Sequence, residues 1–438
     1  MPPNRSRDFS GNTNTRTRTA GVRRNSLVVF LLVFVLIILL LMYNDVRRIR
    51  KQLNTVFEQN SITAVDSEKS GTDAQNSSEI QAGSMTVSDD VRDRVDDMMA
   101  EMSLDEKLCQ LLFVTPEQLT GADTVSMAGE MTEQALEKYP VGGIIYFEKN
   151  LESREQISEM IANTQSYSKI PLFIGVDEEG GRVARISREN LGFDVIEPMK
   201  AVGEAGDPQR ALEIGRTIAG NLKPLGFNVD FAPVADVLLN ADNTEIGDRS
   251  FGNDPNVVAE MVKQEVISLQ ENGISAALKH FPGHGSAKTD SHDGYSESTR
   301  TMEELRETEF LPFQAGIGAG ADFVLVSHIT MVGIEENELP ASLSKMFITD
   351  ILKNELKYEK LVITDSLRMG AITDNYSSGD AAVMAIEAGA DILLMPQDID
   401  GAFTGLKNAL ESERIRETQV DERVRRILQV KIGRDIIK

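Results

Sequence analysis

The sequence predicts an α/β protein, a (β/α)8 barrel of the TIM type preceded by a single transmembrane helix and a disordered tether. Three observations support this prediction. Sixteen consecutive apolar residues, Leu27–Met42, form one uninterrupted run. A polar stretch poor in aromatic residues occupies 53–88. From about Asp89 onward, eight short β-rich apolar runs alternate with amphipathic helical stretches, which is the order of a parallel βα barrel.

The apolar run has the length and composition of a membrane-spanning helix. No charged residue occurs in 25–44, and twenty helical residues at ~1.5 Å each reach ~30 Å, the thickness of the hydrocarbon core of a bilayer. A cleavable signal peptide is the alternative, but the following sequence, YNDVRRIRKQ, has no small-residue cleavage site. Six arginines precede the run and four basic residues follow it closely. This distribution favours a cytoplasmic segment at 1–24, a signal anchor at 25–44 and a body outside the cytoplasm of a single-pass cell-membrane protein.

Composition narrows the classes of partner. The net charge is -24, although residues 1–52 carry ten Lys and Arg against two Asp, so the body is strongly acidic. An acidic body argues against a nucleic-acid partner, which requires clustered basic residues. Residues 45–88 are expected to form a polar, disordered linker. The single cysteine, Cys109, excludes an internal disulfide framework and a cysteine-based metal site, and it is expected to be buried and inert.

The remaining residues, 89–438, are expected to form the barrel as one domain. Its eight strands are predicted at 111–114, 142–147, 171–177, 227–234, 274–281, 323–329, 361–366 and 392–396. Helices between them are predicted at 153–165, 208–226 and 255–273, the second with a proline at its start and a glycine after its end. In such a barrel the functional residues lie at the carboxyl ends of the strands.

The histidines are concentrated in one segment. All four lie between His280 and His328, and three of them fall within KHFPGHGSAKTDSH at 279–292. Glycines and prolines after His280 predict a loop. Asp290 precedes His292 by two residues, and a carboxylate bonded to an imidazole raises the pKa of the imidazole toward a value suited to acid/base work. The segment therefore indicates an acid/base group carried on a loop.

Asp365 closes the apolar strand predicted at 361–366. At that position it is expected to point at the mouth of the barrel, with a helix N-cap as the alternative. A nucleophilic carboxylate facing an acid/base group is the arrangement used in retaining glycoside hydrolysis.

These residues carry a resemblance to a known family. The segment at 279–292 resembles the KH-F-P-G-H-G-x4-D-S-H motif of glycoside hydrolase family 3, in its single-domain β-N-acetylglucosaminidase (β-hexosaminidase) branch. Further matching segments are VDEEGGRVARI (176–186), VDFAPVADV (229–237), GDRSFGNDP (247–255) and ITDSLRMGAI (363–372). The resemblance covers residues 89–438 and implies a (β/α)8 catalytic domain of the type found at the N-terminus of family members.

The resemblance also implies roles for individual residues. Asp365 corresponds to the nucleophile, and His292, supported by Asp290, corresponds to the acid/base group. The residues expected to hold the terminal sugar are Asp177, Arg185, Arg249, Lys279 and His280. His284 is expected to shape the loop, and His328 to pack at the barrel mouth. The implied double displacement requires neither a cofactor nor a metal ion.

The resulting hypothesis is a membrane-anchored, exo-acting retaining β-N-acetylglucosaminidase whose substrate is a GlcNAc-terminated glycan, with peptidoglycan fragments as the expected source. Alternatives within the family are a β-glucosidase, a β-xylosidase or a GlcNAc phosphorylase. A zinc hydrolase using His280, His284, His292 and Asp290 and a non-catalytic surface glycan-binding module are alternatives of other classes. The sequence leaves the oligomeric state open.

Overall fold

The computed structural model describes residues 88–288, 296–334 and 338–438. The predicted basic segment and transmembrane helix, and the predicted linker except for Ser88, lie outside the described residues. Among the helices of the described part, none has both the length and the apolar character needed to cross a bilayer.

Eight parallel strands form a nearly closed barrel. They pair in the order β11-β9-β7-β6-β3-β2-β1-β12, and a parallel bridge from Ile363 to Ile392 connects the two end strands. The strands are β1 (Leu112–Val114), β2 (Gly143–Ile145), β3 (Phe173–Val176), β6 (Val229–Asp230), β7 (Ser275–Phe281), β9 (Phe323–Val326), β11 (Leu361–Thr364) and β12 (Leu393–Leu394). All eight predicted strands are confirmed in their predicted order. Several are shorter than predicted because the apolar runs continue into the loops that follow the strands.

Two small pairings lie outside the barrel sheet. β4 (Glu178–Gly180) and β5 (Val183–Ala184) form an antiparallel hairpin directly after β3. Gly180 and Gly181 at its turn have φ values of 88° and 55°, which glycine adopts without the strain that a side chain would introduce. β8 (Ser296–Ser298) pairs in parallel with β10 (Ile329–Met331).

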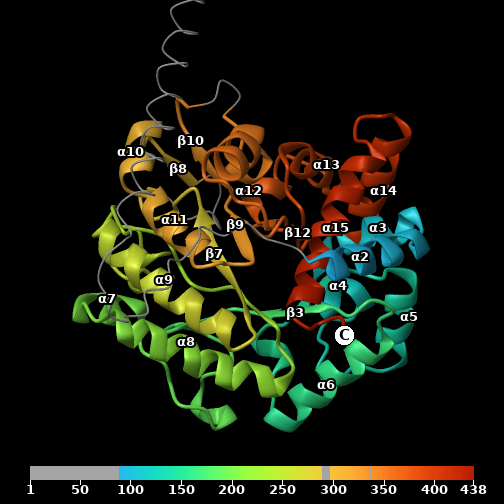
Figure 1. Cartoon of the computed structure of the whole chain (residues 1–438), viewed down its shortest axis with the longest axis horizontal. Helices are drawn as coiled ribbons and strands as arrows, with labels where there is room; N and C mark the ends of the chain where they lie inside the picture. Colours follow the sequence, from blue (N-terminus) through green and yellow to red (C-terminus); the bar gives the residue numbers. More distant parts are fainter. Residues whose placement is uncertain (1–87, 289–295, 335–337) are drawn as a thin grey trace, which may run out of the picture. The chain divides into compact units, whose positions relative to one another are not determined.

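Helices cover the outside of the barrel, and α8, α9 and α11 follow one another along it in Figure 1. The α-helices are α2 (Asp89–Glu101), α3 (Leu104–Gln110), α4 (Pro116–Thr120), α5 (Glu130–Lys138), α6 (Arg154–Tyr167), α7 (Met199–Ala205), α8 (Pro208–Leu222), α9 (Pro255–Glu271), α10 (Met302–Glu307), α11 (Phe310–Gly318), α12 (Gly370–Thr373), α13 (Ser378–Ala388), α14 (Ile399–Glu411) and α15 (Glu417–Gly433), and a π-helix spans Met346–Glu355. The three predicted helices correspond to α6, α8 and α9. The carboxylates of Asp207 and Asp254 cap α8 and α9, each directly before a proline.

Buried carboxylates at the amino ends of two strands attach the last helix. Asp391 precedes β12 and binds Lys353 at 3.0 Å and Arg426, on α15, at 2.7 Å. Burial alone would raise the pKa of Asp391, but these cations outweigh it and lower the pKa to about 2. Asp322 precedes β9 and binds Arg434, which follows α15. The charged groups at the amino ends of these strands therefore hold the barrel and its last helix together.

Phenylalanine rings fill the barrel interior. The ring of Phe113 lies 6.5 Å from that of Phe173 and 5.5 Å from that of Phe231, centroid to centroid. Gly175 leaves the space for them, because a Cβ there would lie 2.7 Å from the Phe231 ring. Cys109 is buried as predicted, and burial raises the pKa of its thiol to about 12. The barrel is thus a packed core, with an apolar floor beneath its carboxyl-end loops.

Candidate active site

A cavity of about 580 Å³ lies at the carboxyl ends of the strands. Phe231 contributes to its apolar wall, and residues near the end of β7 and residues that follow β3 and β11 contribute polar side chains. The predicted site residues that line it are Asp177, Arg185, Arg249, Lys279, His280 and Asp365. The fold therefore brings together these six residues from four separate segments of the sequence.

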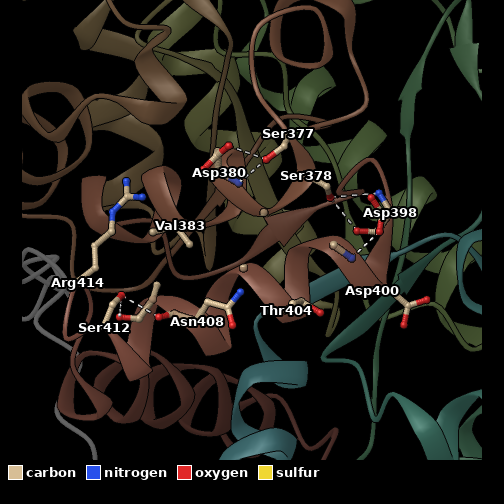
Figure 2. Close-up of a pocket in the computed structure, with 14 residues that line it drawn as sticks. Ser377, Ser378, Asp380, Val383, Asp398, Asp400, Thr404, Asn408, Ser412 and Arg414 are labelled. Carbon is tan, nitrogen blue, oxygen red and sulfur yellow. Dashed lines mark hydrogen bonds between the residues drawn. The ribbon is translucent and has the colours of Figure 1, made fainter.

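A second hollow, of about 610 Å³, lies between α13 and α14 (Figure 2). The two helices approach closely at Gly379 and Gly405, which have no side chains. A Cβ on Gly405 would lie only 2.5 Å from the Cα of Gly379. The hydroxyl of Ser378 is already bonded to the backbone oxygen of Asp398 at 2.8 Å. This hollow contains none of the predicted catalytic or sugar-binding residues, so the candidate active site is the cavity at the strand ends.

A buried carboxylate, Glu179, bonds to two buried cations of the cavity, Arg249 and Lys279. It accepts two hydrogen bonds from Arg249, at 2.8 and 2.9 Å, and its Oε1 lies 2.5 Å from Lys279 Nζ. The three residues are 1%, 8% and 2% exposed, respectively. Burial works to raise the pKa of Glu179, but the two cations outweigh it and hold the pKa well below its ordinary value. Glu179 is therefore ionised and fixes both cations in place.

Lys279 also donates to Asp177 Oδ1 at 2.7 Å. Burial would lower the pKa of Lys279, but Asp177 and Glu179 raise it above the ordinary value. Lys279 is thus a permanent cation between two carboxylates. Asp177 is the more exposed of these acids, with 20% of its side chain accessible, so it can accept a hydrogen bond from a ligand in the cavity.

The hydrogen bonds of His280 define its tautomer. Its Nδ1 lies 2.7 Å from Asp236 Oδ2, and its Nε2 lies 3.3 Å from Arg249 Nη2. Because a guanidinium can only donate, Nε2 accepts from Arg249 and Nδ1 donates to Asp236. Asp236 also accepts the backbone N–H of His284 at 2.6 Å, and so orients the start of the histidine loop.

Asp365 follows β11 and faces the same cavity. Its backbone N–H donates to Val326 at 2.8 Å, and its Oδ1 accepts from the backbone N–H of Ser366 at 2.7 Å. Burial works to raise its pKa, but His328, His280, the Ser366 N–H and Lys279 together lower it. The side chain is therefore a carboxylate at neutral pH, as a nucleophile requires.

The other two described histidines differ in their contacts. His328 is buried and lies outside the cavity lining, where its Nε2 donates to the backbone oxygen of Ser366 at 2.8 Å and its Nδ1 accepts from Ser342 at 2.7 Å. It thus supports the backbone beside Asp365, in agreement with its predicted packing role. The backbone of His284 bonds to Asp236, which fits the predicted loop-shaping role, while its buried ring nitrogens have no partner.

Arg185 reaches the cavity through the hairpin that follows β3. Its backbone N–H and those of Ile186 and Ser187 donate to the buried carboxylate of Glu178, at 2.7 to 2.9 Å. The Nε of Arg185 is buried without a hydrogen-bond partner, and the side chain lines the cavity. This placement is compatible with a ligand contact.

The predicted acid/base pair, Asp290 and His292, lies outside the described residues, so its position stays a prediction. No group of three or more His, Cys, Asp or Glu side chains in 88–288, 296–334 and 338–438 is arranged to hold a metal ion. Sequence reasoning did not assign roles to Glu179 and Asp236, although both lie inside the segments VDEEGG and VDFAPVADV. The available signal for Asp236 was its place in a largely apolar segment, where a charged residue usually needs a buried partner. Glu179 is the last of three successive acids, so its sequence carried no such signal.

Comparison with known proteins identifies the family. Residues 103–430 match the glycosyl hydrolase family 3 N-terminal domain. The chain belongs to glycosyl hydrolase family 3. The resemblance found in the sequence is thereby confirmed, and the chain is a family 3 glycoside hydrolase barrel.

Named relatives come from several bacteria. Beta-hexosaminidase from Stenotrophomonas maltophilia is 37% identical over 294 residues, which cover 64% of this chain and 85% of that protein. Beta-hexosaminidase A from Pseudoalteromonas piscicida is 32% identical over 342 residues, 71% of this chain and 56% of that protein. The solved structure of a family 3 β-N-acetylglucosaminidase from Paenibacillus sp. has 35% identity and a TM-score of 0.73, over 77% of this chain and 64% of that chain. The family 3 chain therefore spans less than two thirds of the last two proteins.

Replacing the central carboxylate tests the ion cluster. In the Glu179→Gln variant, the buried Lys279 and Arg249 lose their shared counter-charge, so we expect the free energy of unfolding to fall by about 3 kcal/mol. Urea denaturation measures this change. The matched control is Glu197→Gln, which removes the partner of Arg210 in an exposed pair and should change stability by less than about 1 kcal/mol. Equal losses in the two variants would contradict the structural role of Glu179.

Proposed function

We propose that this chain is a membrane-anchored, exo-acting retaining β-N-acetylglucosaminidase that releases terminal β-linked GlcNAc from peptidoglycan fragments. The observation that carries the proposal is the placement of Asp365 in one cavity with the cluster of Asp177, Glu179, Arg249 and Lys279. The relatives named beta-hexosaminidase support the choice of an N-acetylated sugar.

In the proposed first step, an oxygen of Asp365 bonds to the anomeric carbon while the bond from that carbon to the leaving oxygen breaks. His292, supported by Asp290, donates a proton to the leaving oxygen. In the second step, His292 removes a proton from water, the water oxygen bonds to the anomeric carbon, and the bond to Asp365 breaks. The lowered pKa of Asp365 keeps the nucleophile ionised for the first step.

The ion cluster supplies sugar binding in this scheme. Charged donors and acceptors that are already fixed by buried partners lose little entropy when they bond to hydroxyl groups. Asp177 offers an acceptor, while Lys279 and Arg249 offer donors. Their hydrogen bonds can strengthen as positive charge develops on the sugar ring in the oxocarbenium-like transition state. These groups converge on a cavity of about 580 Å³, which is large enough for a terminal sugar.

Arg368, a cation that lines the cavity, is the argument for a substrate whose leaving sugar carries a negative charge. Arg368 lines the cavity, its side chain is exposed, and it forms no ion pair with any residue of the described part of the chain. An unpaired guanidinium at this position can bind a carboxylate on the sugar that leaves. The lactyl carboxylate of muramic acid is such a group, and it supports peptidoglycan fragments as the substrate.

The anchor is part of the same proposal and rests on the sequence of residues 25–44 and its basic flanks. The full chain should remain in the membrane fraction after extraction with high salt, because apolar burial does not weaken as salt screens charges. Deletion of residues 1–52 should release the protein. Retention of the deletion variant on membranes would contradict this anchor.

The nucleophile is tested by hydrolysis of p-nitrophenyl glycosides of β-GlcNAc, β-glucose and β-xylose, with residues 86–438 as the enzyme. We expect selective release from the GlcNAc substrate and a loss of at least about 10³-fold in Asp365→Ala. Azide, a small external nucleophile, should restore turnover to this variant and give the inverted glycosyl azide. Asp374→Ala, at an exposed site nearby, serves as the control and should retain activity.

Selective release from another sugar would favour the β-glucosidase or β-xylosidase alternative, and dependence on phosphate would favour a phosphorylase. No turnover by folded protein would favour a binding module.

The leaving-group contact is tested with Arg368→Gln. We expect kcat/KM for GlcNAc-β-1,4-MurNAc to fall by about tenfold, since a charge-assisted hydrogen bond is lost. The value for the uncharged disaccharide N,N′-diacetylchitobiose should stay within about twofold. Arg216→Gln, at an exposed site on α8, controls for the loss of one positive charge. An equal fall for both substrates would argue against recognition of a carboxylate by Arg368.

A further inference from the structure

Two buried carboxyl groups close to the sugar-binding cluster have no role in the proposed mechanism. Asp230 is the last residue of β6 and is 0% exposed, and Glu265 lies on α9 and is 1% exposed. Neither residue lines the cavity. Asp230 is linked to the site by a hydrogen bond, and Glu265 lies close enough to Glu179 and Lys279 for their charges to act on its pKa.

Glu265 has no hydrogen-bond partner. Both of its carboxyl oxygens are buried and unpaired, and so is the hydroxyl of Ser268, one turn further along α9. Glu178 shows what a buried carboxylate ordinarily requires, because it accepts three backbone N–H bonds. A carboxylate without a donor or a contacting cation pays the full cost of desolvation, and it avoids that cost by binding a proton. The geometry thus indicates that Glu265 is an uncharged carboxylic acid.

The charges around Glu265 act in the same direction. Glu179 on β4 and Asp230 on β6 are acidic neighbours, and Lys279 at the end of β7 is the cation that faces it. Burial and Glu179 raise the pKa of Glu265 to about 8, although Lys279 opposes them. Burial, Glu178 and Glu265 raise the pKa of Asp230 well above its ordinary value.

The helices packed against α9 supply no further counter-charge. On α8, the residue that approaches Glu265 is Gly215, where a Cβ would lie 3.0 Å from the Glu265 backbone oxygen. The charged residues of α8 are exposed: Arg210, Glu213 and Arg216. The sequence of α11, FLPFQAGIG, contains no charged residue. Helix α7 also packs against α9, and its two charged residues, Lys200 and Glu204, are exposed. In this layer, therefore, Lys279 is the cation close to Glu265, and it is already bonded to Asp177 and Glu179.

Asp230 makes a direct link to the sugar site. Its Oδ1 accepts the backbone N–H of Glu178 at 3.0 Å, whereas its Oδ2 is buried without a partner. Glu178 lies between Asp177 and Glu179 in the chain, and these two residues are the carboxylates that hold Lys279. The hydrogen bond from Glu178 therefore fixes the segment that carries both acids.

We propose that Asp230 and Glu265 are positioning residues that act as uncharged carboxylic acids behind the sugar site, and that loss of the Glu265 proton in alkaline solution weakens substrate binding. Ionised Glu265 would place a second negative charge beside Glu179 and compete with it for Lys279. The effect on turnover rests on the proposed glycosidase function. The protonation of the two acids does not.

The first experiment compares the wild type with Glu265→Gln, whose amide has nearly the shape of the protonated acid. The p-nitrophenyl β-GlcNAc substrate is used because its leaving group departs as the phenolate and needs no proton from His292. The kcat/KM of the wild type for this substrate should fall at alkaline pH with a midpoint of about 8. In Glu265→Gln the fall should move to higher pH by at least about one unit, with neutral activity within about threefold of the wild type. Glu271→Gln, an exposed site on the same helix, should keep the wild-type profile. Coincident profiles for wild type and Glu265→Gln would overturn the proposal.

The second experiment separates the hydrogen bond of Asp230 from its charge. Asp230→Asn keeps an acceptor oxygen for the Glu178 N–H and should leave KM within about threefold, whereas Asp230→Leu should raise KM about tenfold or more and change kcat less. A loss in Asp230→Asn equal to that in Asp230→Leu would show that an ionised carboxylate is required, and would overturn the role of the neutral acid. Asp230→Asn decides this point even if Asp230→Leu fails to fold.

A third measurement needs no substrate. Infrared spectra of the wild type near pH 6 should contain the carbonyl band of an un-ionised carboxylic acid that is missing from Glu265→Gln. The folded state retains this proton between the ordinary pKa of 4.5 and about 8, so wild-type stability should fall relative to Glu265→Gln as the pH rises through that window. Absence of both effects would overturn the proposal even in an active enzyme, and their presence in an inactive enzyme would refute only the glycosidase function.

Discussion

The part of the cavity that we propose to bind the sugar depends on one buried carboxylate, Glu179. Glu179 holds Lys279 from β7 and Arg249 from the loop after β6, and each cation then bonds to a further acid or to His280. Such a cluster is costly to desolvate, and it is tolerated because each charge has a partner at hydrogen-bonding distance. The free-energy cost of desolvating these charges is incurred when the protein folds. The donors and acceptors are therefore already oriented before a ligand binds.

The two ends of the strands use charge differently. At the amino ends, Asp322 and Asp391 bind cations on or beside α15 and hold the last helix to the barrel. At the carboxyl ends, the acids and cations are arranged around a cavity, and Asp177 keeps part of its side chain accessible. Saturated ion pairs serve stability, whereas pairs with a remaining hydrogen-bonding direction can serve binding.

The proposed nucleophile and the proposed sugar-binding groups lie on separate elements of the structure. The carboxylate of Asp365 accepts the backbone N–H of Ser366. His328, which lies outside the cavity lining, donates to the backbone oxygen of the same serine. The cluster around Glu179 is built on β4, β7 and the loop that carries Arg249. In the proposed reaction, this separation would allow the cations to orient a sugar while Asp365 keeps the negative charge that a nucleophile requires.

The sequence alone determined the eight strands and the strand-end positions of Asp177, Lys279, His280 and Asp365, because period and residue type are local properties. The sequence could not distinguish the roles of the neighbouring Glu178 and Glu179. Glu178 accepts three backbone N–H groups, whereas Glu179 binds two cations. Asp236 and His280 form a hydrogen bond although 44 positions separate them in the sequence. In the sequence, Glu265 cannot be distinguished from an ordinary charged residue on the surface of a helix. Only the tertiary structure decided these roles, because the protonation and partners of a buried charge depend on what the fold packs around it.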